Sequence, residues 1–175
     1  ISATSRPPRG TEQHGVELEH MDYVQIHPTC LYSKKPGRSF LISESARGEG
    51  AILLNHKGER FVNELLPRDV VTKAIHEEME KEGVDHEFIS FENVPEEIIK
   101  GHFPHIYEKC LEEGYDILKE PAPIVPAQHY FMGGVHVDHD SETTMPHLYA
   151  VGETSCNGVH GKNRLASNSL LESLV

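Results

Sequence analysis

The chain has 175 residues, of which 37% are apolar, so its length suits about one domain with an ordinary core. The formal net charge of -12 argues against a nucleic-acid surface, because phosphate binding requires clustered Lys and Arg. No apolar run reaches the roughly 20 residues that a bilayer span requires, and no charged-then-apolar leader opens the chain. We therefore expect a soluble, cytoplasmic protein with no nucleic-acid or membrane partner.

Residues 1–20 are rich in turn formers and predict a loop or linker. Short β-prone runs follow at 23–26, 40–43 and 51–54 and, after a turn at Lys57-Gly58, at 60–62. This spacing predicts a small sheet that contains a hairpin.

The clearest helical pattern lies between Pro67 and Gly83. Pro67 suits the first helical turn, an apolar stripe runs through 70–79, and Gly83 suits the end, so we expect a helix over 67–82. A second helix is expected over 104–113. A short helical turn is expected from Pro95, and a strand over 87–89.

Prolines interrupt the chain again beyond Pro121. Residues 122–127 are too rich in proline for a central strand, whereas 135–137 and 148–151 are typical of strands. Residues 165–174 have a helical composition. The elements together indicate an α+β fold.

The three cysteines are widely spaced, odd in number and in no Cys-x-x-Cys pair, which favours neither a disulfide framework nor a zinc site. They are Cys30, Cys110 and Cys156. The thirteen histidines show no His-x3-His or His-Glu-x-x-His spacing. We expect reduced thiols and no bound metal.

Polar residues beside glycine or proline recur at five places, of which residues 152–164 are the densest. Three glycines there allow the backbone to approach a ligand closely, and Asn163 and Arg164 supply donors for carboxylate or phosphate oxygens. The other four are His27-Pro-Thr29, Glu44 to Gly50, Pro67-Arg68-Asp69 and His129-Tyr130.

Each of these places has a structural alternative. His27 could be a satisfied structural histidine, and Arg68 could be solvated or paired with Asp69. Residues 152–161 could be a plain connection, and Arg47 and Glu49 could pair on the surface. A cationic Arg68 at a helix start conflicts with the helix dipole, which hints at function.

Taken in order, the motifs over residues 21–175 resemble the succinate dehydrogenase/fumarate reductase flavoprotein family. They include Asp22-Tyr-Val-Gln-Ile-His27-Pro-Thr29, Leu66-Pro-Arg-Asp-Val70, Pro126-Ala-Gln-His-Tyr130, Leu148-Tyr-Ala-Val-Gly-Glu153 and Val159-His-Gly-Lys-Asn-Arg164. Ala166-Ser-Asn-Ser-Leu-Leu-Glu172 is similar to the L-aspartate oxidase branch, since respiratory members usually read Gly-Ala-Asn-Ser-Leu-Leu-Asp there. Lys162 stands where alanine is usual and remains unexplained at this level.

The resemblance implies a capping domain with a small mixed sheet and covering helices over 22–131. Incomplete pieces of an α/β FAD-binding domain would flank it, with 1–21 as a linker or remnant and 132–175 as the C-terminal part. The family binds a C4 dicarboxylate such as L-aspartate or fumarate. The positions that would line the pocket are His27, Ser43, Glu44, Arg68, His129 and Arg164. Ser43 is commonly threonine in the branch, which keeps the hydroxyl.

The implied reaction converts L-aspartate to iminoaspartate with oxygen or fumarate as acceptor, the first step of NAD (quinolinate) biosynthesis. The alternative is a fumarate reductase or succinate dehydrogenase flavoprotein. The resemblance gives Arg68 the acid/base role. A free arginine, however, holds its proton to a pKa above about 12, so chemistry alone favours Arg68 as a charge clamp and a histidine as proton carrier.

For the cofactor, the resemblance places Glu153, Ser169 and Leu170 against FAD, with a helix from about Ser167 directing its amides at the flavin ring. No Gly-x-Gly-x-x-Gly occurs, so the turn that would hold the pyrophosphate is missing. We expect a truncated piece of a larger enzyme that alone binds no FAD and is inactive, or a noncatalytic interaction domain. A homodimer and transfer of iminoaspartate to quinolinate synthase are further expectations.

Overall fold

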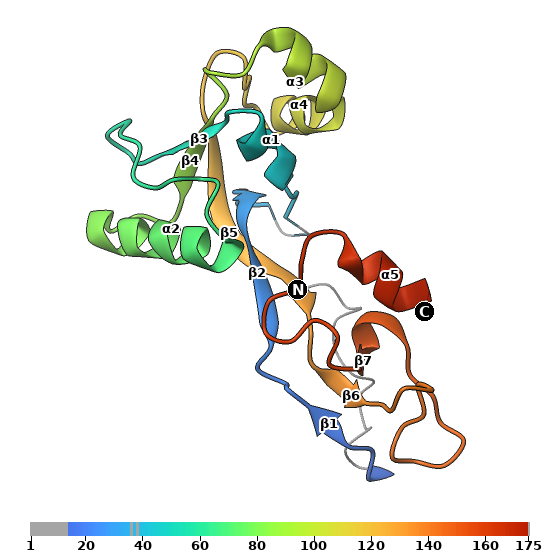
Figure 1. The fold of residues 1–175 in the computed structure, drawn as a ribbon. Helices are drawn as coiled ribbons and strands as arrows, with labels where there is room; N and C mark the ends of the chain where they lie inside the picture. Colours follow the sequence, from blue (N-terminus) through green and yellow to red (C-terminus); the bar gives the residue numbers. More distant parts are fainter. Residues whose placement is uncertain (1–13, 36, 38, 175) are drawn as a thin grey trace. The chain divides into compact units, whose positions relative to one another are not determined.

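The computed structural model describes residues 14–35, 37 and 39–174, and the chain divides into two compact units (Figure 1). Unit 1 comprises residues 1–25 and 128–175, and unit 2 comprises residues 26–127. Both contain helices and strands, which confirms the expected mixture of α and β structure. Within the described ranges, every helix is too short or too polar to cross a bilayer.

Unit 2 is built on a four-stranded sheet in the order β2-β5-β4-β3. The strands are β2 (Val24–Leu31), β5 (Ala122–Phe131), β4 (Glu87–Ser90) and β3 (Ile52–Leu54). Both β3–β4 and β4–β5 are antiparallel, and Ile89 pairs with Leu53 on one side and with Ala122 on the other. The chain passes from one unit to the other within β2 and within β5.

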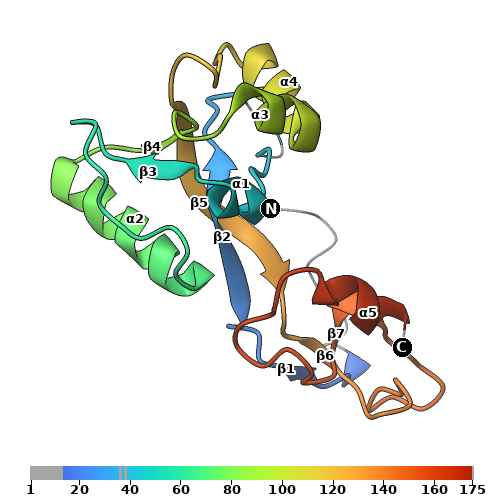
Figure 2. The ribbon, with the colours of Figure 1, turned by 45° about the horizontal axis from the view of Figure 1, so that its top comes forward.

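The described part of unit 2 contains four α-helices. They are α1 (Glu44–Gly48), α2 (Arg68–Glu82), α3 (Glu96–His102) and α4 (Pro104–Glu112). Figures 1 and 2 show α2 alongside the β3–β4 end of the sheet, with α3 and α4 packed together elsewhere. The predicted helix over 67–82 is confirmed, since α2 starts after Pro67 and ends at Gly83 in the left-handed region, with φ of 70°.

The core of unit 2 joins these layers. It includes Val71 and Ile75 from α2, Leu53 and Ile89 from the sheet, and Ile106 from α4. The apolar stripe read from the sequence thus becomes the face of α2 that is buried against the sheet.

The expectation that residues 122–127 avoid a central strand is wrong. They form the first part of β5, which lies between β2 and β4. Tyr32 N donates to Pro123 O at 2.9 Å, so the main-chain groups of Pro123 face β2. Its missing N–H therefore removes one possible bond with β2 and leaves the pairing of Ala122 and Ile124 with β4 intact.

Three predicted strands are shorter than expected. Residues 40–43, 60–62 and 148–151 contribute isolated bridges only, at Leu41, Arg60 and Tyr149. In the first case the reason is local, because Ser43 already serves as the N-cap of α1 and turns the chain out of the extended conformation.

Unit 1 contains a three-stranded sheet in the order β1-β6-β7, formed by β1 (Leu18–Glu19), β6 (Gly134–His136) and β7 (Ser155–Cys156). The short helix η2 (Gly152–Thr154) packs against α5 (Asn168–Leu174). The loop predicted for 1–20 therefore contains β1, and residues 1–13 lie outside the described part. A Cβ on Gly133 would lie 1.9 Å from His20 O, so this crossing requires glycine.

Candidate functional site

In unit 2 the carboxylate of Glu44, the first residue of α1, connects Arg47 in the last turn of α1 with Arg68 at the start of α2. Oε2 of Glu44 accepts hydrogen bonds from Arg68 Nε at 3.0 Å and Nη2 at 2.7 Å. Oε1 of Glu44 accepts from Arg47 Nη2 at 3.2 Å. The bonds from Arg68 hold the pKa of Glu44 below its ordinary value, and the charges of Arg68, Arg47 and His27 act in the same direction. Arg68 is therefore held by an ion pair and is not a solvated side chain.

Arg47 is a site residue that sequence reasoning misjudged. Its side chain is buried, and Nη1 donates to Glu64 O at 2.6 Å, which excludes the structural alternative of a surface pair with Glu49. Glu49 instead lies 3.5 Å from His102 Nδ1. The available signal was the i, i+3 spacing of Glu44 and Arg47, which brings their side chains together on a helix.

Ser43 and His27 are two further candidate residues of unit 2. Ser43 Oγ accepts from Ser45 N at 3.2 Å and so caps α1 directly before Glu44. His27 lies in β2 and is buried, and its Nδ1 accepts from Thr29 N at 3.2 Å. Thr29 Oγ1 in turn donates to Ile42 O at 2.9 Å, which ties β2 to the segment that leads into α1.

In unit 1 the buried residue Arg164 lies against an aromatic ring. Its Cζ is 4.3 Å from the ring centre of Tyr130, which follows His129 on β5. The main chain of Arg164 is fixed on both sides: its N donates to Met132 Sδ at 3.3 Å, and its O accepts from Gln25 Nε2 at 2.7 Å. His129 itself is half-buried.

The three candidate cofactor residues lie on two elements that pack together. Glu153 belongs to η2, and its Oε1 accepts from Phe131 N at 3.0 Å. Ser169 and Leu170 form the first turn of α5. A Cβ on Gly152 would lie 3.1 Å from Ser173 Oγ, so glycine allows η2 and α5 to approach closely.

In unit 1 the side chain of Lys162 lies over an aromatic ring. Its Nζ lies 5.1 Å from the ring centre of Tyr23, a cation–π distance. The ring of Tyr23 is stacked on that of His20 at 4.2 Å. The charge that stands in place of the usual alanine therefore packs on an aromatic pair.

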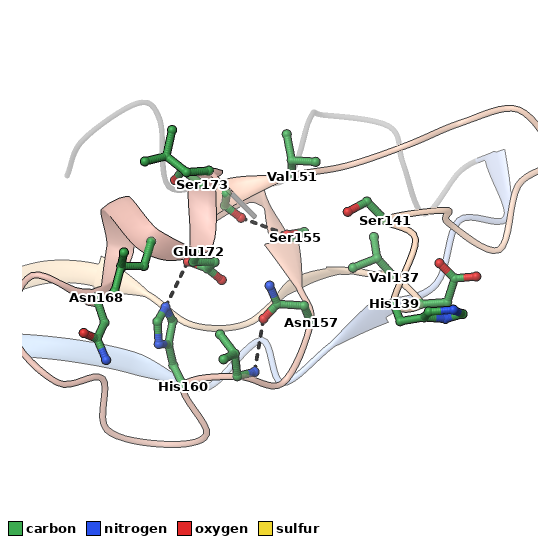
Figure 3. A pocket seen from close by; sticks show the side chains of 15 residues that line it. Val137, His139, Ser141, Val151, Ser155, Asn157, His160, Asn168, Glu172 and Ser173 are labelled. Atoms are coloured by element: carbon green, nitrogen blue, oxygen red, sulfur yellow. Dashed lines mark hydrogen bonds and ion pairs between the residues drawn. The ribbon is translucent and has the colours of Figure 1, made fainter.

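A pocket of about 680 Å³ lies beside α5 in unit 1 (Figure 3). Its lining combines apolar residues, such as Val151, Val159 and Leu171, with the polar side chains of His160 and Glu172. The three apolar residues are 61% to 66% exposed. Nothing in the described part of the chain covers this face.

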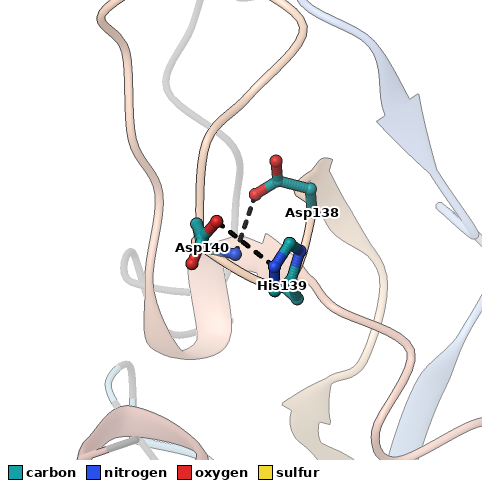
Figure 4. Close-up of side chains that lie close together, drawn as sticks. All are labelled: Asp138, His139 and Asp140. Atoms are coloured by element: carbon teal, nitrogen blue, oxygen red, sulfur yellow. Dashed lines mark hydrogen bonds and ion pairs between the residues drawn. The ribbon is translucent and has the colours of Figure 1, made fainter.

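One group of three side chains in the described residues has spacing suited to a metal: Asp138, His139 and Asp140 (Figure 4). All three are exposed. Asp138 Oδ1 accepts from Glu142 N at 3.0 Å and from Asp140 N at 2.9 Å, and these bonds lower the pKa of Asp138. The turn thus accounts for the position of Asp138 without a metal.

All three cysteines are free and buried. Burial raises the pKa of Cys30 to about 11 and that of Cys110 to about 12. Such thiols carry almost no thiolate at neutral pH and are poor nucleophiles.

Comparison with known proteins places these features in context. Residues 7–170 match the family described as FAD binding domain. The L-aspartate oxidase of Clostridium perfringens is 58% identical over 164 residues, which cover 93% of this chain and 37% of the relative. That of Pseudomonas aeruginosa is 49% identical over 92% of this chain and 31% of the relative. The chain thus spans about a third of the length of these relatives.

Solved structures agree with this placement. A structure of the E. coli quinol fumarate reductase with a FrdA mutation aligns with a TM-score of 0.82 at 36% identity, covering 93% of this chain and 31% of that chain. A Mycobacterium smegmatis Sdh1 complex in the apo form aligns with a TM-score of 0.73 at 36% identity, covering 94% and 28%.

Proposed function

Because the chain belongs to the FAD binding domain family, we propose that it is part of an FAD-dependent enzyme that oxidises L-aspartate to iminoaspartate. The observation that carries the proposal is the 58% identity to an L-aspartate oxidase, together with the ion-paired Arg68 and the buried Arg164. We call the longer flavoprotein that would contain this chain the parent enzyme.

The proposed dicarboxylate ligands are the residues at the family's motif positions: His27, Ser43, Glu44, Arg68, His129 and Arg164. Arg68 and Arg164 supply the two positive charges that a doubly anionic substrate requires, and a guanidinium binds a carboxylate through two parallel hydrogen bonds. Both side chains are largely buried, so their charges act where water screens them little. Fixing both carboxylates would orient the substrate Cα.

When bound, FAD supplies the hydride acceptor. We propose that Glu153, Ser169 and Leu170 contact it, and that the flanks 1–21 and 132–175 belong to the flavin domain while 22–131 form the capping domain. The chain alone would not retain FAD, because it has no Gly-x-Gly-x-x-Gly turn and leaves Leu170 and Val151 exposed. The isolated chain would then be inactive.

Two roles remain open for Arg68. As the proton donor, it would exchange protons through Glu44, which accepts two of its N–H bonds. As a charge clamp, it would leave proton transfer to His27 or His129.

Replacing Arg68 by lysine in the parent enzyme separates these roles, because lysine keeps the charge and loses the two-bond geometry. We expect the rate of fumarate reduction to fall by about 100-fold or more, the range of a lost acid catalyst. Lys73→Arg, on an exposed part of α2, serves as the matched control and should leave the rate unchanged. Full activity of Arg68→Lys would assign the proton to a histidine.

The second candidate is a fumarate reductase or succinate dehydrogenase flavoprotein. The structural match to quinol fumarate reductase favours it, and the pocket residues would be shared. Oxidation of L-aspartate and of succinate by the parent enzyme, measured at equal concentrations, decides between the two. We expect iminoaspartate from aspartate and no turnover of succinate. Succinate turnover without aspartate oxidation would establish the second candidate instead.

Finer parts of the proposal follow from the L-aspartate oxidase relatives. Oxygen or fumarate would accept the electrons, and the product would enter NAD (quinolinate) biosynthesis by transfer to quinolinate synthase. A cytoplasmic homodimer is proposed as the state of the parent enzyme. The exposed apolar side chains of unit 1 also suit a noncatalytic role of the isolated chain as an interaction domain.

A further inference from the structure

Behind Arg164 in unit 1 lies a group of buried polar side chains that the proposed chemistry does not use. The hydroxyl of Tyr130 donates a short hydrogen bond to Oε2 of Glu172. His160 Nε2 lies 3.0 Å from the same oxygen. Figure 3 draws this contact between His160 and Glu172 as a dashed line. The side chains of His160 and Glu172 are only 6% and 4% exposed.

The burial of the Glu172 carboxylate must be compensated by contacts, because burying a carboxylate is costly unless it is paired and hydrogen-bonded. Two partners converge here on one oxygen of Glu172, one from β5 and one from the loop before Arg164. The ring of His160 also meets the ring of Tyr130 edge-on, with centroids 5.8 Å apart. The Tyr130 ring is therefore fixed by a hydrogen bond at its oxygen and by an aromatic contact.

The Tyr130 ring also lies against the Arg164 guanidinium, whose Cζ is 4.3 Å from the ring centre. Donation of the Tyr130 hydroxyl to a carboxylate shifts electron density into the ring, which strengthens its attraction for a cation. Burial, together with the bond to Glu172, also raises the pKa of Tyr130, so the hydroxyl keeps its proton. The neutral ring of Tyr130 and the guanidinium of Arg164 thus form a cation–π pair.

We propose that Tyr130, Glu172 and His160 form a positioning network that fixes the guanidinium of Arg164 for one carboxylate of the dicarboxylate substrate. The inference rests on the proposed function for the identity of that substrate. Glu172 lies on α5, the helix whose first turn carries the proposed flavin contacts Ser169 and Leu170. The network therefore links the substrate clamp to the flavin-contacting helix.

The kinetic test uses Tyr130→Phe in the FAD-loaded parent enzyme, which keeps the ring and removes the bond to Glu172. Arg164 would hold the carboxylate equally in the ground and transition states, so KM for L-aspartate should rise about tenfold while kcat changes less than about twofold. Glu172→Gln should raise KM in the same direction. Tyr149→Phe, an exposed tyrosine of the same unit, is the control and should leave KM unchanged. Unchanged KM in both Tyr130→Phe and Glu172→Gln would overturn the network.

A second readout needs no substrate turnover. Phenylglyoxal modifies exposed arginines, and mass spectrometry reports the rate at Arg164 in the apo parent enzyme. We expect that rate to rise about fivefold or more in Tyr130→Leu, which removes the ring that covers the guanidinium, at an unfolding temperature close to that of the wild type. The labelling rate at Arg164 should rise less in Tyr130→Phe. This variant provides the test if Tyr130→Leu does not fold.

The two readouts separate the two claims. A parent enzyme that does not oxidise L-aspartate, yet shows faster labelling of Arg164 in the Tyr130 variants, disproves the proposed substrate and supports the network. Aspartate oxidation with unchanged labelling and unchanged KM in the Tyr130 variants supports the proposed function and disproves the network.

Discussion

The two units bury their apolar side chains very differently. In unit 2, Ile75 and Ile89 are 0% exposed and belong to one core that joins the sheet to the helices. In unit 1, Leu170 and Leu174 of α5 are 65% and 73% exposed, and no apolar side chain of α5 is buried among the described residues. Unit 2 therefore contains its own core, whereas the described part of unit 1 exposes a face that suits a partner surface.

The units also hold their proposed substrate arginines by different means. In unit 2, Arg68 is held by Glu44, which Arg47 supports from the other oxygen. In unit 1, Arg164 is held by the face of Tyr130 and by its own main chain. Removing one charge should therefore loosen the contacts that hold Arg68 in unit 2, whereas removing one aromatic ring should loosen those that hold Arg164 in unit 1.

The largest expected effect is a loss of stability on truncating a core residue of unit 2, compared with truncating an exposed residue of unit 1. Ile75→Ala should lower the free energy of unfolding by about 2–5 kcal/mol, because it leaves a cavity in a closed core. Leu174→Ala should change it by less than about 0.5 kcal/mol. Urea titration followed by circular dichroism measures both. Equal losses would mean that α5 is as well packed as α2.

An intermediate effect is expected from the buried arginine. Arg47→Leu should lower the free energy of unfolding by about 3 kcal/mol, since it removes a buried guanidinium from its ion pair with Glu44 and leaves Glu64 O without its donor. Lys73→Leu, which removes an exposed charge from α2, should change stability little. The same urea titration reports both variants, and a harmless Arg47→Leu would show that the ion pair does not hold Glu44.

The last expected effect concerns pH and involves Glu87, at the start of β4. Neither of its carboxyl oxygens has a hydrogen-bond partner in the described part of the structure, and burial raises its pKa from 4.5 to about 7, with a smaller contribution from Glu82. The folded state therefore binds the proton more tightly than the unfolded state. The contribution of the Glu87 carboxyl to stability is therefore fully present below pH 4.5 and is lost as the pH rises through about 7.

Glu87→Gln removes this dependence. Relative to the variant, the wild type should lose stability between pH 5 and pH 8, as measured by unfolding at intervals of about one pH unit. The exposed Glu77→Gln is the control and should follow the wild type. A wild type and a Glu87 variant with parallel pH profiles would show that the carboxyl is ionised in the folded protein.

Several features could be predicted from sequence because their causes are local. The start, stripe and end of α2 depend on Pro67, on apolar spacing and on Gly83. The course of β5 could not, because the cost of Pro123 depends on which neighbouring strand its main chain faces. The burial of Arg47 and the bond between Tyr130 and Glu172, 42 residues apart, arise from tertiary packing that no local pattern encodes.

We propose that the chain carries dicarboxylate-binding residues of a flavoprotein and that unit 1, as described, is too open to hold the flavin. The most direct measurement is flavin absorbance of the 175-residue chain after incubation with FAD and gel filtration. We predict a colourless protein. An equimolar amount of retained FAD would contradict the account, because the exposed face of unit 1 would then suffice to bind the cofactor.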